Sequence, residues 1–286
     1  MLIDKDGQAY IYWSMGNIFV ARLKENMLEL DGEPQIIDNL PEKGLKEGPW
    51  VFERNSIYYL TFPHVENKIE RLEYAISDNP MGPFKMTGVI MDESPLNCWT
   101  NHQSFIEKDG QWFLFYHQNE YSPKFDKNRS ACIDSMFFNA DGTIRKVTPT
   151  YRGVGITNAE SKIEIDRFSL KSDSSVAIAF IDTSSVFNGW KTVLNKKDDW
   201  IQYNSVEFGK KLKTVQVYCK SEKGGTLEIY LDKADGELLS KVTIPKSFDW
   251  QITEAKISNI KPGNHNLVTV LKDNYPVEID WIRFEK

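Results

Sequence analysis

The chain has 286 residues, which is too long for one small domain and suits two. Hydrophobic residues make up 41% and charged residues 27%, a composition that forms packed cores and argues against disorder. The net charge of -6 offers no basic field for nucleic acid, and no polybasic cluster suggests a membrane surface. No apolar run is long enough to span a bilayer. We therefore expect no nucleic-acid or membrane partner.

Aromatic residues reach 13%, which suits proteins that stack on sugar rings and also suits the cores of β-rich proteins. The three cysteines, Cys98, Cys132 and Cys219, match no metal-ligand spacing or disulfide framework, so free thiols are expected. The first seven residues lack a basic head and an apolar middle, so no signal peptide is expected in this chain.

Short strands closed by polar turns account for most of the first half. Aromatic runs at residues 8–13, 56–62 and 111–116 each follow a turn such as Lys108-Asp109-Gly110. Their recurrence at roughly fifty-residue intervals predicts a β-propeller with one such hairpin per blade. Further strands are expected at residues 18–23, 72–76 and 130–134.

The sequence changes character after residues 153–155, where lysine-richer strands begin and continue to the end of the chain. Their regular spacing predicts an antiparallel β-sandwich of the jelly-roll type. The predicted fold is therefore all-β, with a partial propeller over residues 1–155, a linker near residues 153–161, and a sandwich over residues 160–286.

A series of ordered motifs in the first half resembles glycoside hydrolase family 43. They are Lys46-Glu47-Gly48-Pro49-Trp50, Arg54-Asn55, Tyr58-Tyr59-Leu60, residues 77–84, residues 88–91, Thr100-Asn101-His102, residues 112–117, Arg129-Ser130 and residues 139–144. The resemblance implies a five-bladed propeller, and an enzyme that removes arabinofuranose or xylose from plant polysaccharides with inversion of configuration.

Inversion needs two carboxyl groups roughly 6.5–9.5 Å apart, one to protonate the leaving oxygen and one to activate a water. By its motif, Glu47 corresponds to the general acid, and the Gly48-Pro49 turn that follows suits a side chain presented at the edge of a blade. A solvated glutamate in a turn is the alternative.

The resemblance places a general base and an orienting aspartate before the Asp4-Lys5-Asp6-Gly7 turn, where this chain does not contain them. Two interpretations remain open: a full enzyme represented without its N-terminal blades, or a protein that binds polysaccharide without cutting it. In either case we expect this chain alone to be inactive. Unpaired blade edges also predict self-association.

Two further residues match sugar-pocket positions of the family. His102 resembles a histidine on the propeller axis beside a calcium ion or water, although Gln103 replaces a second histidine that often accompanies it. Arg129 matches an arginine that points toward the sugar, where its donors would bind ring hydroxyls. His64 and His117 end aromatic strands and are weaker candidates to line the pocket.

The second half resembles the family 6 carbohydrate-binding modules. The residues that carry this resemblance are 163–166, 199–203, 206–209, 224–232, 235–236, Trp250, 263–267 and 279–284. The resemblance implies a structural calcium ion held by Glu164, Asp166 and Asp280, since hard carboxylate oxygens suit Ca²⁺. Three surface carboxylates without an ion are the alternative.

Modules of this family hold sugar between two aromatic rings, with an asparagine that bonds hydroxyls. Trp190 and Trp250 are the candidate rings, and Asn274 is the candidate amide, because Glu278 stands where the family often has asparagine. The predicted function is hydrolysis of hemicellulose of the arabinoxylan class, with non-catalytic polysaccharide binding as the alternative. The family is secreted or periplasmic, and the sequence does not identify the sugar linkage.

Overall fold

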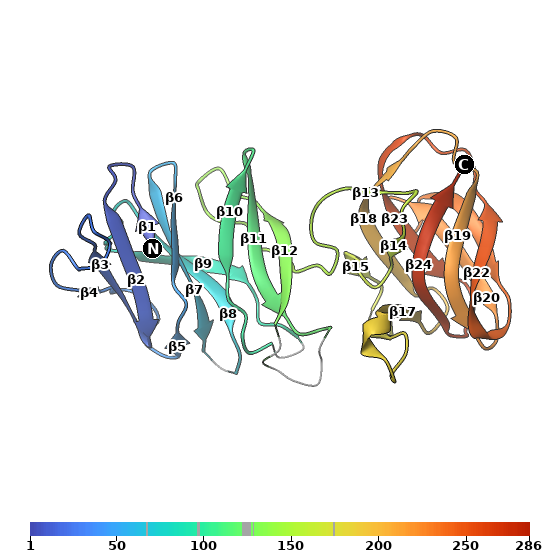
Figure 1. Ribbon diagram of the computed structural model, residues 1–286, viewed down its shortest axis with the longest axis horizontal. Coiled ribbons are helices and arrows are strands. Elements are labelled where there is room, and N and C mark those ends of the chain that lie inside the picture. The colour runs from blue at the N-terminus through green and yellow to red at the C-terminus, as the bar shows by residue number, and fades with distance from the viewer. Residues whose placement is uncertain (67, 96–97, 122–126, 128, 174) are drawn as a thin grey trace. The chain divides into compact units, whose positions relative to one another are not determined.

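The structure is a computed structural model that describes residues 1–66, 68–95, 98–121, 127, 129–173 and 175–286. The chain forms two compact units, Met1–Pro149 and Thr150–Lys286. Both units consist of strands, and within the described ranges a 3-10 turn at Val186–Asn188 is the sole helical element (Figure 1). No helix in those ranges has the length and apolar character needed to cross a membrane. The all-β class predicted from the sequence is confirmed.

The first unit consists of three successive antiparallel sheets, which are the blades of the propeller (Figure 1). The first blade has the order β1-β2-β3-β4, the second β5-β7-β8-β9 with β6 also paired to β7, and the third β10-β11-β12. The strands are β1 (Leu2–Ile3), β2 (Ala9–Met15), β3 (Asn17–Arg22), β4 (Gln35–Ile36), β5 (Leu45–Lys46), β6 (Trp50–Arg54), β7 (Ile57–Val65), β8 (Arg71–Ser77), β9 (Lys85–Met91), β10 (Ser104–Lys108), β11 (Gln111–Gln118) and β12 (Ser130–Met136).

Local turn chemistry sets the register of these hairpins. Two-residue turns connect β6 to β7 at Asn55-Ser56 and β10 to β11 at Asp109-Gly110, and both central residues of each turn have positive φ. This geometry matches the right-handed twist of the flanking strands, and Asn, Asp and Gly reach it at the lowest cost. The aromatic strands predicted after these turns are therefore held in one register.

Aromatic packing joins neighbouring blades. The Phe52 ring of the second blade stacks on Tyr59 at 4.8 Å and lies 4.7 Å from the Trp112 ring of the third blade, measured between ring centroids. Phe105 lies 5.1 Å from the same Phe52 ring. Because rings of this size dominate the energetics of burial, these contacts fix the second and third blades against each other.

The second unit is a sandwich of two sheets. One sheet has the order β13-β18-β23-β20-β21 with β15 paired to β18, and the other has the order β16-β17-β24-β19-β22 with β14 paired to β24. The strands are β13 (Thr157–Asn158), β14 (Ile163–Glu164), β15 (Leu170–Lys171), β16 (Ala177–Phe180), β17 (Trp190–Leu194), β18 (Trp200–Phe208), β19 (Thr214–Ser221), β20 (Gly225–Leu231), β21 (Glu237–Ile244), β22 (Ser247–Lys256), β23 (Gly263–Leu271) and β24 (Val277–Glu285).

The core of the sandwich lies between these sheets and is lined by alternate residues of each strand. On β19, for example, Val215, Val217 and Cys219 are buried, and the residues between them are partly exposed. The period of two is what a sheet with one covered face requires. Within the stretch expected to be a linker, β13 already pairs with β18 and Ala159 is buried in this core.

Core burial makes one substitution a direct test of the sandwich. Leu227 on β20 is fully buried, so Leu227→Ala is expected to lower the free energy of unfolding by about 2–5 kcal/mol through lost burial and a cavity. Leu170→Ala removes the same atoms from a side chain that is 48% exposed and is expected to cost less than about 1 kcal/mol. Urea unfolding followed by fluorescence measures both, and equal effects would contradict the described core.

Candidate functional site

Glu47 lies in a β-bulge that interrupts the first strand of the second blade. Lys46 pairs with His64 and Trp50 pairs with Thr61, so residues 47–49 face only residues 62–63 of β7. The Glu47 N–H donates to the Pro63 carbonyl at 3.3 Å, and Gly48 has φ 49°. Bulges redirect a side chain at the rim of a sheet, and here the Glu47 side chain remains 35% exposed.

Glu70 brings a second carboxyl group to Glu47. It directly precedes β8, the strand beside β7, and only 1% of its surface is exposed. Burial, and after it the hydrogen bond and charge of Glu47, raise the pKa of Glu70 to about 9, against the opposing effects of the Asn101 backbone and the charge of Arg129. Glu70 is therefore protonated near neutral pH and able to donate a hydrogen bond.

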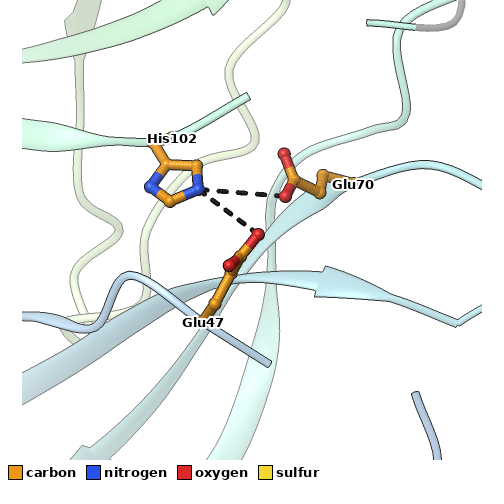
Figure 2. Close-up of side chains that lie close together, drawn as sticks. All are labelled: Glu47, Glu70 and His102. Carbon is orange, nitrogen blue, oxygen red and sulfur yellow. Dashed lines mark ion pairs between the residues drawn. The ribbon is translucent and has the colours of Figure 1, made fainter. Parts of the chain in front are cut away.

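His102 reaches the same point from the third blade, two residues before β10. Its Nε2 lies 3.5 Å from Glu47 Oε1 and 3.8 Å from Glu70 Oε1, as Figure 2 shows. A Cβ on Gly48 would lie 2.6 Å from His102 Nδ1, so the ring packs against a backbone position that only glycine leaves open. The Gly48 of the motif thus has a role in the site as well as in the turn.

Gln103 fastens the bulge to the third blade. Its Nε2 donates to the Gly48 carbonyl at 3.1 Å and to Thr61 Oγ1 at 3.2 Å, and the side chain is buried. Thr61 Oγ1 in turn donates to the Trp50 carbonyl. The residue that replaces the expected second histidine therefore holds both ends of the bulge in place.

The charge of Arg129 acts on this site, because it opposes the raised pKa of Glu70 and also lowers the pKa of His117, for which burial is the larger cause. The His117 Nδ1–H donates a hydrogen bond to the Thr100 carbonyl at 2.9 Å. His64 is different: it is buried between Glu73 and the Lys43 carbonyl, so the expectation that it lines a pocket is wrong.

Three ionisable groups therefore meet from three different segments. Glu47, Glu70 and His102 each offer an atom within 4.8 Å of the other two, and among the described residues this is the group of His, Cys, Asp and Glu side chains that could hold a metal ion. The same three groups could exchange a proton, since one is exposed, one is buried and protonated, and one is an imidazole.

In the second unit, two of the predicted calcium ligands, Glu164 and Asp280, lie on the paired strands β14 and β24, and Asp166 lies in the turn after β14. Glu164 on β14 is opposite Trp281 on β24, and the Ile165 N–H donates to the Asp280 carbonyl at 3.0 Å. Burial and the negative charges of Glu164 and Asp166 raise the pKa of Asp280 to about 7. The three carboxylates are thus close enough to repel one another, which is the donor arrangement that a hard cation relieves.

The predicted sugar-binding residues of this unit are spread over one sheet. Trp190 begins β17 and packs on Phe180 at 4.1 Å, whereas Trp250 lies on β22 beside Tyr218 at 5.2 Å. Strands β24 and β19 separate β17 from β22, so their backbones are about 14 Å apart at ordinary strand spacing. Asn274, in the loop before β24, accepts a hydrogen bond from the Lys197 N–H at 3.4 Å.

Comparison with known proteins agrees with this architecture. Residues 1–144 match Glycosyl hydrolases family 43, and residues 168–286 match Carbohydrate binding module (family 6). The first match covers half of the chain, so the protein belongs to the glycosyl hydrolases of family 43. Both resemblances drawn from the sequence motifs are confirmed.

Individual relatives cover the chain to different extents. It is 33% identical over 159 residues to a β-D-galactofuranosidase, xynD, of Aspergillus niger, spanning 53% of this chain and 45% of that protein. It is 23% identical over 320 residues to an arabinoxylan arabinofuranohydrolase of Paenibacillus polymyxa, spanning 94% of this chain and 47% of the relative. The chain thus spans about half the length of the curated relatives it matches.

One solved structure extends the comparison of the fold to both units. It is the family 43 arabinoxylan arabinofuranohydrolase of Bacillus subtilis in complex with cellotetraose, at 22% identity and a TM-score of 0.53. The alignment covers 100% of this chain and 66% of that chain. At this identity the likeness concerns the fold, which is a propeller followed by a sandwich.

No sequence motif indicated Glu70 as a site residue or Gln103 as the hydrogen-bond partner of the Gly48 carbonyl. Glu70 lies in the run Ile69-Glu70-Arg71, which reads as the polar entry to an exposed strand. By the strand period of two, residue 70 shares a face with the buried Leu72 and Tyr74, although Glu73 and Ala75 on the opposite face of β8 are buried as well. That a carboxyl group occupies this face, next to Glu47, depends on blade packing.

The raised pKa of Glu70 predicts a dependence of stability on pH. A carboxyl group with a pKa of about 9 in the folded chain and 4.5 in the unfolded chain binds more protons when folded. Its contribution to stability is therefore full below about pH 4.5 and is lost as the pH rises toward 9. In Glu70→Gln, the urea-unfolding midpoint of the first unit is expected to fall less steeply as the pH rises. Glu66→Gln, at an exposed neighbour, should leave the slope unchanged, and a matching slope in Glu70→Gln would contradict the assignment.

Proposed function

We propose that the first unit acts in the hydrolysis of glycosidic bonds in hemicellulose, with Glu47 as the general acid. One observation carries this proposal: Glu47 projects from a bulge, half-exposed, against a buried protonated carboxyl group and an imidazole. A general acid needs one face open to the leaving oxygen and another held by its neighbours. Membership of family 43 supports the same reaction class.

Glu70 supports Glu47 and is not the base of an inverting reaction. A base needs a water molecule between itself and the sugar, hence the roughly 6.5–9.5 Å between the two carboxyl groups. Glu70 offers an oxygen within 4.8 Å of Glu47 and is almost fully buried. The hydrogen bond between the two carboxyl groups orients Glu47, and the proton that Glu70 holds can move along it to Glu47, which then passes a proton to the leaving oxygen.

The substrate class that we propose is arabinoxylan, cleaved at arabinofuranose or xylose residues. Relatives include proteins named arabinoxylan arabinofuranohydrolase and xylosidase/arabinosidase, which supports sugars of the furanose and pentose type. Arg129, whose charge acts on the site, would bind ring hydroxyls there. Plant polysaccharides are polymers outside the cell, so we place the site of action in a secreted or periplasmic setting.

Hydrolysis and its dependence on Glu47 test this function. With 4-nitrophenyl α-L-arabinofuranoside, 4-nitrophenyl β-D-xyloside and arabinoxylan as substrates, Glu47→Gln is expected to lower kcat by about 10²–10⁴, the usual contribution of a general acid. Aryl glycosides with good leaving groups should lose less than arabinoxylan, because they need less protonation.

Glu66→Gln is the matched control, since it makes the same change at an exposed carboxylate beside Arg71. Release of sugar that Glu47→Gln abolishes would also show that the expectation of an inactive chain is wrong. Binding of xylo-oligosaccharides without any release would instead establish the second candidate function, non-catalytic polysaccharide binding.

The second unit supplies carbohydrate binding in this proposal. Trp190, Trp250 and Asn274 are its proposed sugar contacts, and Glu164, Asp166 and Asp280 its proposed calcium ligands. Calcium takes six to eight oxygen ligands, so backbone carbonyls or water would complete the set. When bound, the ion would neutralise the repulsion that raises the pKa of Asp280 and would join β14 to β24.

An ion beside His102 is a second proposal for a metal site. Glu47 and Glu70 lie close enough to share it with the imidazole. A hard ion such as Ca²⁺ is disfavoured in this trio, because one carboxyl group is buried and protonated and one donor is nitrogen. We therefore assign these groups to proton transfer in preference to metal binding.

Calcium binding at the sandwich is tested by its effect on unfolding. Added Ca²⁺ is expected to raise the Tm of the second unit by several degrees, since a ligand at about 100 times its Kd stabilises by about 2.7 kcal/mol. Asp280→Asn should abolish this shift, and Asp235→Asn, at an exposed turn, should keep it. Isothermal titration with Ca²⁺ gives the stoichiometry, and an undiminished calcium shift in Asp280→Asn would overturn the assignment.

A further inference from the structure

A cavity of the second unit lies at the start of β24, next to the loop that connects β23 to β24. Its volume is about 440 Å³, which is enough for a sugar ring and its substituents. Neither of the indoles named above, nor Asn274, is among the described residues that line it. Its walls are Val193, Asn195, Lys220, Ser221, Glu222, Lys223, Tyr275, Pro276 and Glu278.

The loop that carries Tyr275 is held in place by its neighbours. Asp273 accepts a hydrogen bond from the Thr226 N–H at 2.6 Å, and the Pro276 carbonyl accepts one from Ser221 Oγ at 2.8 Å. Asn274 adds the contact to the Lys197 N–H. The Tyr275 side chain between them is 49% exposed. A fixed backbone with an exposed ring is a preorganised stacking surface for the apolar face of a pyranose.

One residue that lines the cavity, Glu278, is an ion-paired carboxylate. Glu278 Oε2 lies 2.8 Å from Lys191 Nζ and 3.6 Å from Lys220 Nζ. Lys191 and Lys220 thus pair with Glu278, which stands where the family often has asparagine. Sugar hydroxyls would find an acceptor in Glu278 and donors in Lys220 and Asn195.

Lys223 is the second lysine that lines the cavity. Lys223 Nζ lies 5.8 Å from the centroid of the Tyr275 ring, and within the described part of the chain it forms no ion pair. Among the lining residues Lys220 and Lys223 balance Glu222 and Glu278, and Glu278 is also paired with Lys191, which lies outside the lining. Lys223 is the cation that lies over the stacking ring.

We propose that this cavity binds a uronic acid residue of an acidic hemicellulose, with the sugar ring stacked on Tyr275 and its carboxylate paired with Lys223. This inference rests on the proposed carbohydrate binding of the second unit and specifies its ligand. A neutral sugar that stacks on Tyr275 displaces the Lys223 ammonium from the ring and offers it no charged partner to replace the lost cation–π contact. A carboxylate on the same ring gives that ammonium a new partner.

Isothermal titration of the full chain with two oligosaccharides that share the same xylotriose backbone tests the proposal. One is xylotriose, and the other is xylotriose that carries a single glucuronic acid branch. At low salt the acidic ligand is expected to bind about fivefold more tightly, the upper value for one exposed ion pair. At about 1 M salt, where the screening length is about 3 Å, the two affinities should become equal.

Variants separate this cavity from the other proposed contacts. Lys223→Gln should remove the preference for the acidic ligand and leave xylotriose affinity unchanged, and Tyr275→Ala should weaken both ligands about tenfold, with Tyr275→Phe restoring them. Phe187→Ala removes an exposed ring from the 3-10 turn at Val186–Asn188 and should change neither affinity. Both side chains lie on the surface, so the variants are expected to fold.

The outcomes distinguish this inference from the proposed function. Equal affinities at low salt, or a preference that survives Lys223→Gln, would overturn the uronate assignment and leave carbohydrate binding intact. Binding that Trp250→Ala abolishes and Tyr275→Ala leaves unchanged would move the ligand to the indole. Failure of both oligosaccharides to bind would reject carbohydrate binding by this unit.

Discussion

The bulge at residues 47–49 is the constraint on which the candidate active site depends. A regular strand would continue from β5 into β6 and turn residue 47 according to the alternation of the sheet. The extra residue, with the positive φ of Gly48, releases Glu47 from that alternation and leaves room for the His102 ring against the backbone. Gln103 then bonds the Gly48 carbonyl, so the third blade fixes the geometry that the bulge creates.

Electrostatics follows from this geometry. Two carboxyl groups in hydrogen-bonded contact cannot both ionise cheaply, and the buried one retains its proton. The pKa of Glu70 is raised first by burial and second by Glu47, so Glu47 has a neutral donor beside it and an imidazole nitrogen 3.5 Å away. Carboxylates also lie close together in the second unit, where burial and the charges of Glu164 and Asp166 raise the pKa of Asp280.

The two candidate sites are built in different ways. In the first, the functional groups come from three segments of two neighbouring blades, so the site exists only when the blades pack through Phe52 and its aromatic partners. In the second, the cavity beside Tyr275 is built from strand ends and one pinned loop of a sandwich with its own core. Ion pairing of Glu278 with two lysines explains how this module keeps a carboxylate where an amide was expected.

Sequence alone determined the strands, the hairpin turns and the family. Alternating apolar and polar residues, aromatic runs and turn residues such as Asp109-Gly110 act locally, so they can be recognised in the sequence itself. It also singled out Glu47, His102 and Arg129, because each lies within a recognisable motif. Only the tertiary structure placed Glu70 against Glu47, buried His64, separated Trp190 from Trp250 by two strands and opened the Tyr275 cavity. Those features depend on which strands pack side by side, and burial and charge coupling between residues distant in sequence arise only from that packing.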